Sequence, residues 1–235
     1  MLAYIKKPET AELIALIKHG RDIIRLLTIA PEMFSGDQIK LLLDSGITIA
    51  AGHSNATYQE ASVAFNQGIK LVTHLYNAMS PLQHRAPGLV GATFEHDDVY
   101  APIILDGQHC DYAAARIAYK LKKDKFFLIS DATFLGRKVA NFNWDNFDAH
   151  LENGFYRNKD GNLAGATISM SEAVQNAYHH LNVTADEAIK MATSRVAAAI
   201  DVENQLGKIK AGFPASFVRF NDDLSEIETL DLRKV

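Results

Sequence analysis

The chain has 235 residues, of which 48% are hydrophobic and 22% charged, an ordinary composition for a globular protein with one main core. Its net charge of −4 argues against a basic surface for nucleic acid. The single cysteine, Cys110, excludes an intrachain disulfide, and no long apolar run or charged-then-apolar leader is apparent. We therefore expect a cytoplasmic protein that binds neither nucleic acid nor membrane.

Five short runs rich in Ile, Leu and Val recur in the first half of the chain, with amphipathic stretches between them. Thr57 and Glu60 form the capping-box pattern that starts a helix. Strands alternating with helices at this spacing predict parallel βα units. We expect strands at Ile23–Ala30, Ile47–Ala51, Ile69–Leu75, Tyr100–Leu105 and Phe126–Ile129, and helices at Thr10–His19, Asp37–Asp44, Thr57–Asn66 and Asp111–Lys122.

The pattern changes after Asp131, where polar and turn-forming residues replace the apolar runs. The Asn153-Gly154 pair is typical of a tight hairpin turn, and Thr184 with Glu187 forms a second capping box. The last two expected strands indicate a small β appendage. We expect hairpin strands in Asn141–Asp148 and Leu151–Arg157, helices at Ser169–Leu181 and Thr184–Ala192, and late strands at Ser216–Phe220 and Ile227–Leu232.

Two α/β architectures share the βα pattern, an open doubly wound sheet and a (β/α)8 barrel. Polar residues follow four of the expected strands, at His53, His74, Asp106–His109 and Asp131. A barrel gathers its strand carboxyl ends at one mouth, whereas an open sheet spreads them along a crevice. We favour the TIM-type barrel because only there would these polar groups converge.

His53 and His74 follow consecutive expected strands, and adjacent strands lie about 4.8 Å apart. Two imidazoles at this spacing can hold one divalent ion, and catalytic zinc keeps an open position for water. The alternative is that each histidine caps a strand end by hydrogen-bonding a loop. Two histidines are also compatible with Fe, Co or Ni, so zinc is our first expectation among several metals.

Asp131 follows the last apolar strand, and its carboxylate would point into the same mouth. It could act as a general base that takes a proton from an attacking water and passes a proton to the leaving nitrogen. The more common use of an aspartate after a strand is a helix N-cap or a loop contact. Its place in the barrel order makes us prefer the catalytic role.

Arg85 and His109 are our candidates for holding an anion, because guanidinium and imidazole groups both donate charge-assisted hydrogen bonds to phosphate. A phosphorylated substrate would explain both residues. The alternatives are a surface arginine in the loop at 81–87 and a histidine paired with a carbonyl.

A series of segments is similar to the N-acetylglucosamine-6-phosphate deacetylase family, in that family's own order over nearly the whole chain. Each motif alone is weak, but the series is specific. The segments are Leu27-Thr-Ile-Ala-Pro-Glu32, Ala51-Gly-His-Ser-Asn-Ala-Thr57, Thr73-His-Leu-Tyr-Asn-Ala-Met79, Leu105-Asp-Gly-Gln-His109, Ser130-Asp-Ala-Thr133, Gly165-Ala-Thr-Ile-Ser-Met170 and Met191-Ala-Thr-Ser-Arg195.

The resemblance implies a metal-dependent amidohydrolase with a TIM barrel and a small β-sandwich, which converts N-acetyl-D-glucosamine 6-phosphate to glucosamine 6-phosphate and acetate in amino-sugar catabolism. It implies that residues 1–205 carry barrel strands four to eight and that 206–235 carry sandwich strands. It also suggests a homodimer. By this resemblance His53 and His74 bind the metal, Asp131 is catalytic, and the substrate is contacted by Asn77, Ala78, Arg85, His109, Leu163, Ala164, Gly165 and Ala166.

The sequence departs from the family at its amino terminus, where a His-Leu-Glu-Gly-Pro segment with a metal-binding glutamate would be expected. Glu32 is a poor substitute because it belongs to the motif of the next strand. We therefore expect a piece lacking the amino-terminal third of the enzyme, with open sheet edges at Ile23–Ala30 and Phe126–Ile129, weak metal binding and low turnover. The alternatives are a chain that oligomerises through these edges, a deacetylase for another N-acyl amino-sugar phosphate such as the galactosamine epimer, and a non-catalytic sugar-phosphate-binding remnant.

Overall fold

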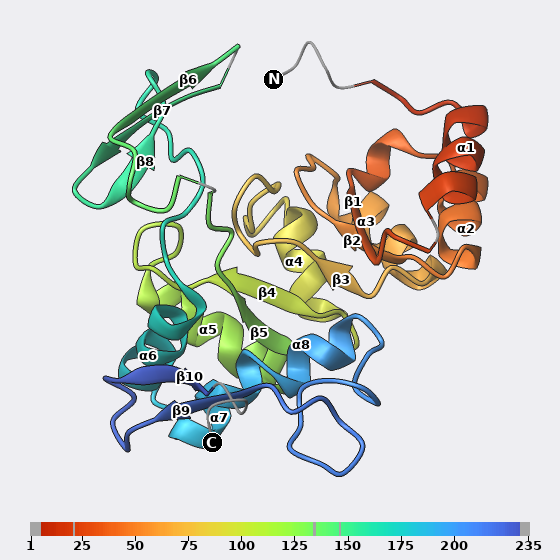
Figure 1. Cartoon of the computed structure of the whole chain (residues 1–235). Coiled ribbons are helices and arrows are strands. Elements are labelled where there is room, and N and C mark those ends of the chain that lie inside the picture. The colour runs from red at the N-terminus through yellow and green to blue at the C-terminus, as the bar shows by residue number, and fades with distance from the viewer. Residues whose placement is uncertain (1–5, 21, 134, 146, 231–235) are drawn as a thin grey trace.

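The computed structural model describes residues 6–20, 22–133, 135–145 and 147–230 (Figure 1). Each of the five apolar runs in its first half contains a parallel strand, as predicted. The third strand is much shorter than its apolar run, because the chain turns toward its loop directly after Val72. The strands are β1 (Leu26–Ile29), β2 (Thr48–Ala51), β3 (Leu71–Val72), β4 (Ala101–Ile104) and β5 (Phe126–Ile129).

The five strands lie side by side in the order in which they occur in the chain. β1 pairs with β2, β2 with β3, and β4 with β5, all in parallel. β3 and β4 are joined by a parallel bridge between Leu71 and Tyr100 and by a hydrogen bond from the Val72 amide to the Tyr100 carbonyl (3.0 Å). β1 and β5 therefore lie at the two ends of this order, as predicted.

Helices follow the strands and pack against them (Figure 1). Ser35, Thr57 and Ser169 each start a helix with a complete capping box, which satisfies amide groups that have no partner within the helix. The helices are α1 (Thr10–Gly20), α2 (Gly36–Asp44), α3 (Tyr58–Gln67), α4 (Gly88–Glu95), α5 (Tyr112–Lys122), α6 (Met170–His180), α7 (Ala185–Met191) and α8 (Ser194–Ala199), and the short 3-10 turns are η2 (Pro31–Met33) and η3 (Lys123–Lys125).

The predicted second capping box is only half formed. The Thr184 hydroxyl accepts from the Glu187 amide at 3.2 Å, as predicted. The Glu187 carboxylate, however, accepts from the Tyr119 hydroxyl at 2.9 Å and pairs with Arg195. A tertiary contact therefore takes the carboxylate that would otherwise close the box.

The polar stretch after Asp131 contains the predicted hairpin around Asn153-Gly154, and a third strand extends it into an antiparallel sheet. We call it the three-stranded lobe, made of β6 (Asn141–Trp144), β7 (Phe147–Glu152) and β8 (Phe155–Arg157). It stands apart from the helices in Figure 1 and has its own small cluster of buried residues, Leu135, Ala149 and Tyr156. The larger core joins the parallel strands to their helices.

The late strands form the antiparallel hairpin β9 (Phe217–Phe220) and β10 (Ile227–Leu230), as predicted. The predicted end of the second strand, Leu232, lies outside the described residues. The hairpin turn is anchored to the main body, because Leu224 is fully buried in the large core and its carbonyl accepts from Gln175 of α6 at 2.6 Å. None of the helices in the described part of the chain has the length and apolar character needed to cross a bilayer.

Candidate functional site at the strand ends

The two predicted metal-binding histidines meet at the carboxyl ends of neighbouring strands. β2 leads through Gly52 into His53, and β3 leads through Thr73 into His74. Their Nε2 atoms are 2.8 Å apart, and their rings are in edge contact with centroids separated by 4.6 Å. Two Zn–N bonds of about 2.0–2.1 Å at a tetrahedral angle would place the nitrogens about 3.3 Å apart, so the two imidazoles would have to separate by about 0.5 Å to hold one ion.

The two imidazoles differ in exposure. His53 is exposed, whereas the His74 residue is only 6% exposed and its Nδ1 has no hydrogen-bond partner. Burial and the neighbouring His53 lower the pKa of His74, and the nearby Asp131 carboxylate opposes this. The balance favours the neutral imidazole, which is the form that binds a metal.

Backbone strain is concentrated in the loops that carry these residues. His53, His74, Ala78 and Asp131 have φ angles of 48°, 30°, 48° and 46°, a region that residues other than glycine rarely adopt. Such conformations persist only where surrounding contacts hold them, and they are enriched at functional sites.

Asp131 follows β5 and is close enough to influence His74 electrostatically. Its side chain is exposed and free to face solvent or a ligand. Its carbonyl accepts from the Ala166 amide, and the Thr133 amide donates to the Ala166 carbonyl, both at 3.0 Å. The segment that contains Ala166 therefore runs beside the strand end that carries Asp131.

The predicted substrate-binding segment 163–166 has two parts. Leu163, Ala164 and Gly165 are half-buried, and a side chain at Gly165 would collide with the Thr133 methyl group. Ala166 is fully buried, and its backbone amide and carbonyl are both used by the Asp131–Thr133 segment. Ala166 therefore supports Asp131 in this structure.

Asn77 and Ala78 lie in the loop after His74. The Asn77 amide donates to the His74 carbonyl at 2.9 Å, and its side chain donates to the Leu75 carbonyl at 3.3 Å. Ala78 is exposed, and its carbonyl accepts from the Ser54 amide at 3.0 Å. This last bond joins the loops that carry the two histidines.

The two predicted phosphate-binding residues are held very differently. Arg85 is exposed in a tight turn closed by hydrogen bonds between Gln83 and Ala86. The His109 side chain is 6% exposed, and its Nδ1 lies 2.6 Å from an Asp106 carboxylate oxygen, which leaves Nε2 for a ligand. The structure does not bring Arg85 into contact with His109 among the described interactions.

Asp106 is a residue whose role the sequence interpretation did not assign. Burial acts to raise its pKa, but hydrogen bonds from His109 and from the Gln108 and His109 amides outweigh this and hold the pKa low. The ionised carboxylate fixes the His109 ring and the loop together. The sequence signal that could have indicated this role is the Asp-x-x-His spacing directly after an apolar strand.

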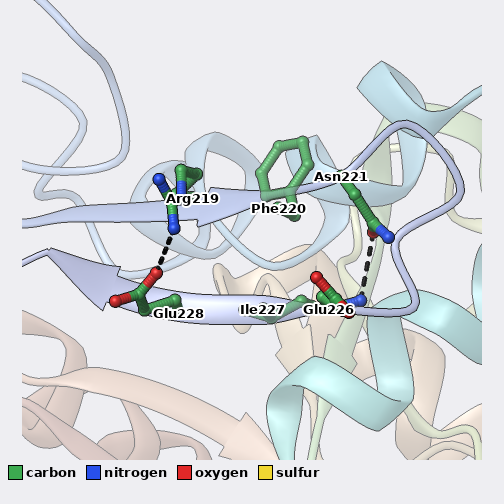
Figure 2. Close-up of a pocket in the computed structure, with 6 residues that line it drawn as sticks. All are labelled: Arg219, Phe220, Asn221, Glu226, Ile227 and Glu228. Atoms are coloured by element: carbon green, nitrogen blue, oxygen red, sulfur yellow. Dashed lines mark hydrogen bonds and ion pairs between the residues drawn. The ribbon is translucent and has the colours of Figure 1, made fainter.

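The described residues contain no group of three His, Cys, Asp or Glu side chains that could hold a metal. The histidine pair is therefore an incomplete protein ligand set within the described part of the chain. A separate pocket of about 320 Å³ lies along the β9–β10 hairpin, where Figure 2 shows Arg219 paired with Glu228 across the strands. This pocket contains none of the predicted site residues, and we assign it no function.

Comparison with known proteins finds a match to the amidohydrolase family model over residues 7–233. N-acetylglucosamine-6-phosphate deacetylase from Haemophilus influenzae is 33% identical over 225 residues, which cover 94% of this chain and 59% of that protein. N-acetylgalactosamine-6-phosphate deacetylase from Shewanella is 39% identical over 202 residues, covering 85% of this chain and 51% of that protein.

Among solved structures, N-acetylglucosamine-6-phosphate deacetylase from Pasteurella multocida superposes with a TM-score of 0.89 at 35% identity, covering 94% of this chain and 59% of that one. The sequence-level resemblance is thus confirmed. The chain spans between 51% and 59% of the length of these relatives.

Proposed function

Because this chain belongs to the amidohydrolase family, we propose that it is the part of a deacetylase that hydrolyses the acetamide of N-acetyl-D-glucosamine 6-phosphate. The products would be D-glucosamine 6-phosphate and acetate, as in amino-sugar catabolism. The observation that carries the proposal is the His53–His74 pair at adjacent strand ends, with Asp131 within electrostatic reach. The similar deacetylases support the choice of reaction.

His53 and His74 would hold one divalent ion through Nε2, with zinc our first expectation and Fe, Co or Ni as alternatives. The ion would supply Lewis acidity, polarising the acetyl carbonyl and lowering the pKa of the attacking water. The neutral form of His74, favoured by its burial, suits this role.

Asp131 would move the protons. Its exposed carboxylate would take one proton from the water as the oxygen bonds to the acetyl carbon. It would then give that proton to the amide nitrogen as the carbon–nitrogen bond breaks. Acetic acid and the amine are thus formed, the acid's proton passes to the amine so that they leave as acetate and ammonium, and the carboxylate returns to its starting state.

The sugar phosphate would be bound by residues outside the metal pair. His109, oriented by Asp106, would offer Nε2 to the phosphate, and the exposed Arg85 would add its guanidinium group. Asn77 and Ala78, in the loop after His74, would contact the sugar. The segment of Leu163, Ala164, Gly165 and Ala166 would line the opposite side, with the first three more accessible than the last.

We further propose that the parallel sheet is part of a (β/α)8 barrel. Its strands occur in chain order without a reversal, whereas an open doubly wound sheet reverses order at a switch point. Residues 1–205 would form the barrel portion and 206–235 part of a β-sandwich. A homodimer and the cytoplasm remain our expected assembly and compartment, the latter favoured by the lone Cys110.

The galactosamine epimer is a second candidate substrate, because the Shewanella relative is named for it. The ratio of kcat/KM for the two N-acetylhexosamine 6-phosphates would decide between them. A ratio above about ten in either direction corresponds to about 1.4 kcal/mol of discrimination and would assign the substrate.

Asp131→Asn tests the chemistry. We expect kcat to fall on the order of 10²- to 10⁴-fold while zinc binding is retained, because the amide cannot accept the proton. Asp44→Asn, which changes an exposed aspartate on α2, is the control and should keep native kcat. Zinc and sugar-phosphate binding with no turnover by the native chain would favour the non-catalytic alternative, and native kcat in Asp131→Asn would contradict the proton-transfer role.

A further inference from the structure

Both carboxylate oxygens of Glu32 accept a hydrogen bond beside the candidate site. Glu32 lies in η2, directly after β1, and is half-buried. One oxygen accepts from the Ser54 hydroxyl at 2.6 Å, and the other accepts from the Asn55 amide at 2.7 Å. Both donors follow His53 in the next loop, so the carboxylate links the end of β1 to the loop that carries this histidine.

The partner of Glu32, Ser54, is a junction between loops. It is 3% exposed, and its hydroxyl oxygen also accepts from the Ala56 amide at 3.0 Å. Its backbone amide donates to the Ala78 carbonyl, and its carbonyl accepts from the Ser80 amide, both at 3.0 Å. The ends of β1, β2 and β3 are therefore connected by one hydrogen-bonded network.

We propose that Glu32 is a positioning residue that holds His53 against His74. His53 has a strained φ of 48°, which neighbouring contacts must maintain, and the bonds to Ser54 and Asn55 are the contacts next to it. Glu32 acts through these bonds, and it belongs to no group of three side chains in the described residues that could hold a metal. The positioning role is inferred from the loop hydrogen bonds alone. Its expected effect on metal binding rests on the proposed function.

Comparing Glu32→Ala with Glu32→Gln shows whether the hydrogen bonds of this side chain position His53. Alanine removes both acceptors and leaves the Asn55 amide without its partner. Glutamine keeps one acceptor oxygen for that amide, and its NH2 group can donate to the Ser54 hydroxyl oxygen. We therefore expect glutamine to rescue the placement of His53.

The first measurement is made on the metal-free chain. The ring centroids of His53 and His74 are 4.6 Å apart, so their ring protons should give a nuclear Overhauser cross-peak. We expect Glu32→Ala to lose this cross-peak and Glu32→Gln to keep it. Asp44→Ala, which removes an exposed carboxylate of the next helix, should leave it unchanged.

The second measurement is zinc affinity by competition with a chelator. Loss of a residue that orients a ligand typically weakens metal binding about 10–100-fold, and we expect this for Glu32→Ala. Glu32→Gln should stay within about three-fold of the native chain, well below that range. If Glu32→Ala does not fold, Ser54→Ala removes the hydroxyl link to Glu32, together with the acceptor for the Ala56 amide, and should weaken zinc binding in the same direction.

The two measurements test different claims. A native chain that binds no zinc would count against the proposed function, while the ring cross-peak would still decide the role of Glu32. A Glu32→Ala chain that keeps both the cross-peak and native zinc affinity would overturn the inference.

Discussion

Gly52 has no space for a side chain between β2 and His53. A Cβ at this position would lie 2.1 Å from the Thr73 methyl carbon and 3.3 Å from that of Thr28. Thr73 itself precedes His74, so the side chain next to one histidine packs against the glycine next to the other. The close approach of these strand ends helps to bring the imidazoles together.

Gly52→Ala should therefore separate the two histidines. We expect it to lower the free energy of unfolding by about 1–3 kcal/mol, as overpacked sites do, and to weaken zinc binding. Thr73→Ser removes the colliding methyl group and should restore most of both losses when combined with Gly52→Ala. Chemical unfolding and chelator competition on the two single variants and the double variant measure this coupling. Additive losses in the double variant would show that the Thr73 methyl is not the obstacle.

The histidine pair and Asp131 could be predicted because each polar residue directly follows a buried apolar strand. Their proximity follows from parallel pairing, which brings carboxyl ends together. The structural roles of Asp106 and Glu32 could not be predicted in this way, since they depend on how a loop turns back on itself or reaches the next loop. The positive φ angles of His53 and Asp131 give no signal in residue type, because such conformations normally favour glycine.

At the scale of elements, Lys122 of α5 is buried at the end of α4. It is 3% exposed, and its Nζ donates to the carbonyls of Thr93 (2.9 Å) and His96 (2.6 Å). These carbonyls lie at the carboxyl end of α4, where helical partners are missing. Burial lowers the pKa of Lys122 to about 8, although the nearby Asp97 and Asp98 act in the opposite direction.

The lowered pKa predicts a stability that increases at alkaline pH. Between about pH 8 and 10.5 the unfolded chain keeps the Lys122 proton while the folded chain loses it, so the free energy of unfolding should rise with pH. The full effect is at most about 3 kcal/mol. Lys122→Met should lack this rise, whereas Lys120→Met, at an exposed position of α5, should keep it. Urea unfolding at pH 7.5 and 10 compares them, and parallel pH profiles for the native chain and Lys122→Met would contradict the assignment.

Elements with their own capping signals were predictable from local sequence. Thr57 starts α3 and Gly68 ends it, as the pattern indicates. α4 was missed because it starts at Gly88 and is buried on most sides, so it has neither a strong cap nor an amphipathic pattern. The predicted helix at Thr184–Ala192 is present as α7, but its complete capping box was predicted wrongly because Glu187 pairs with Arg195 of the following helix.

At the scale of the whole molecule, the order of the strands in the sheet bears on the choice between an open sheet and a barrel, which the alternation of strands and helices does not decide. Alternating strands and helices suit both an open sheet and a barrel. The observed order β1-β2-β3 continues through the Leu71–Tyr100 bridge to β4-β5, and such long-range pairing has no local sequence signal.

The described residues form three separate buried clusters, one of them within the three-stranded lobe, and this predicts unequal stability. Tyr156 is fully buried in the small cluster of the three-stranded lobe, and its hydroxyl donates to the Val139 carbonyl at 2.8 Å. The lobe has few such residues, whereas β2, β4 and their covering helices share the large core. Regions with fewer buried contacts open with a smaller free energy than the main core.

Tyr156→Ala should therefore open the lobe and spare the parallel sheet. Removing a fully buried aromatic side chain lowers the free energy of unfolding by about 3–5 kcal/mol. The lobe cluster has only two other buried residues to stabilise it. We expect amide hydrogen exchange to accelerate in β6, β7 and β8 while β2 and β5 keep their native protection. Trp144→Phe, at a position that is 73% exposed in the same lobe, should change neither region. Equal acceleration in both regions would mean that the lobe and the parallel sheet unfold as one cooperative unit, so that the small cluster contributes directly to the stability of the strand ends that carry His53 and His74.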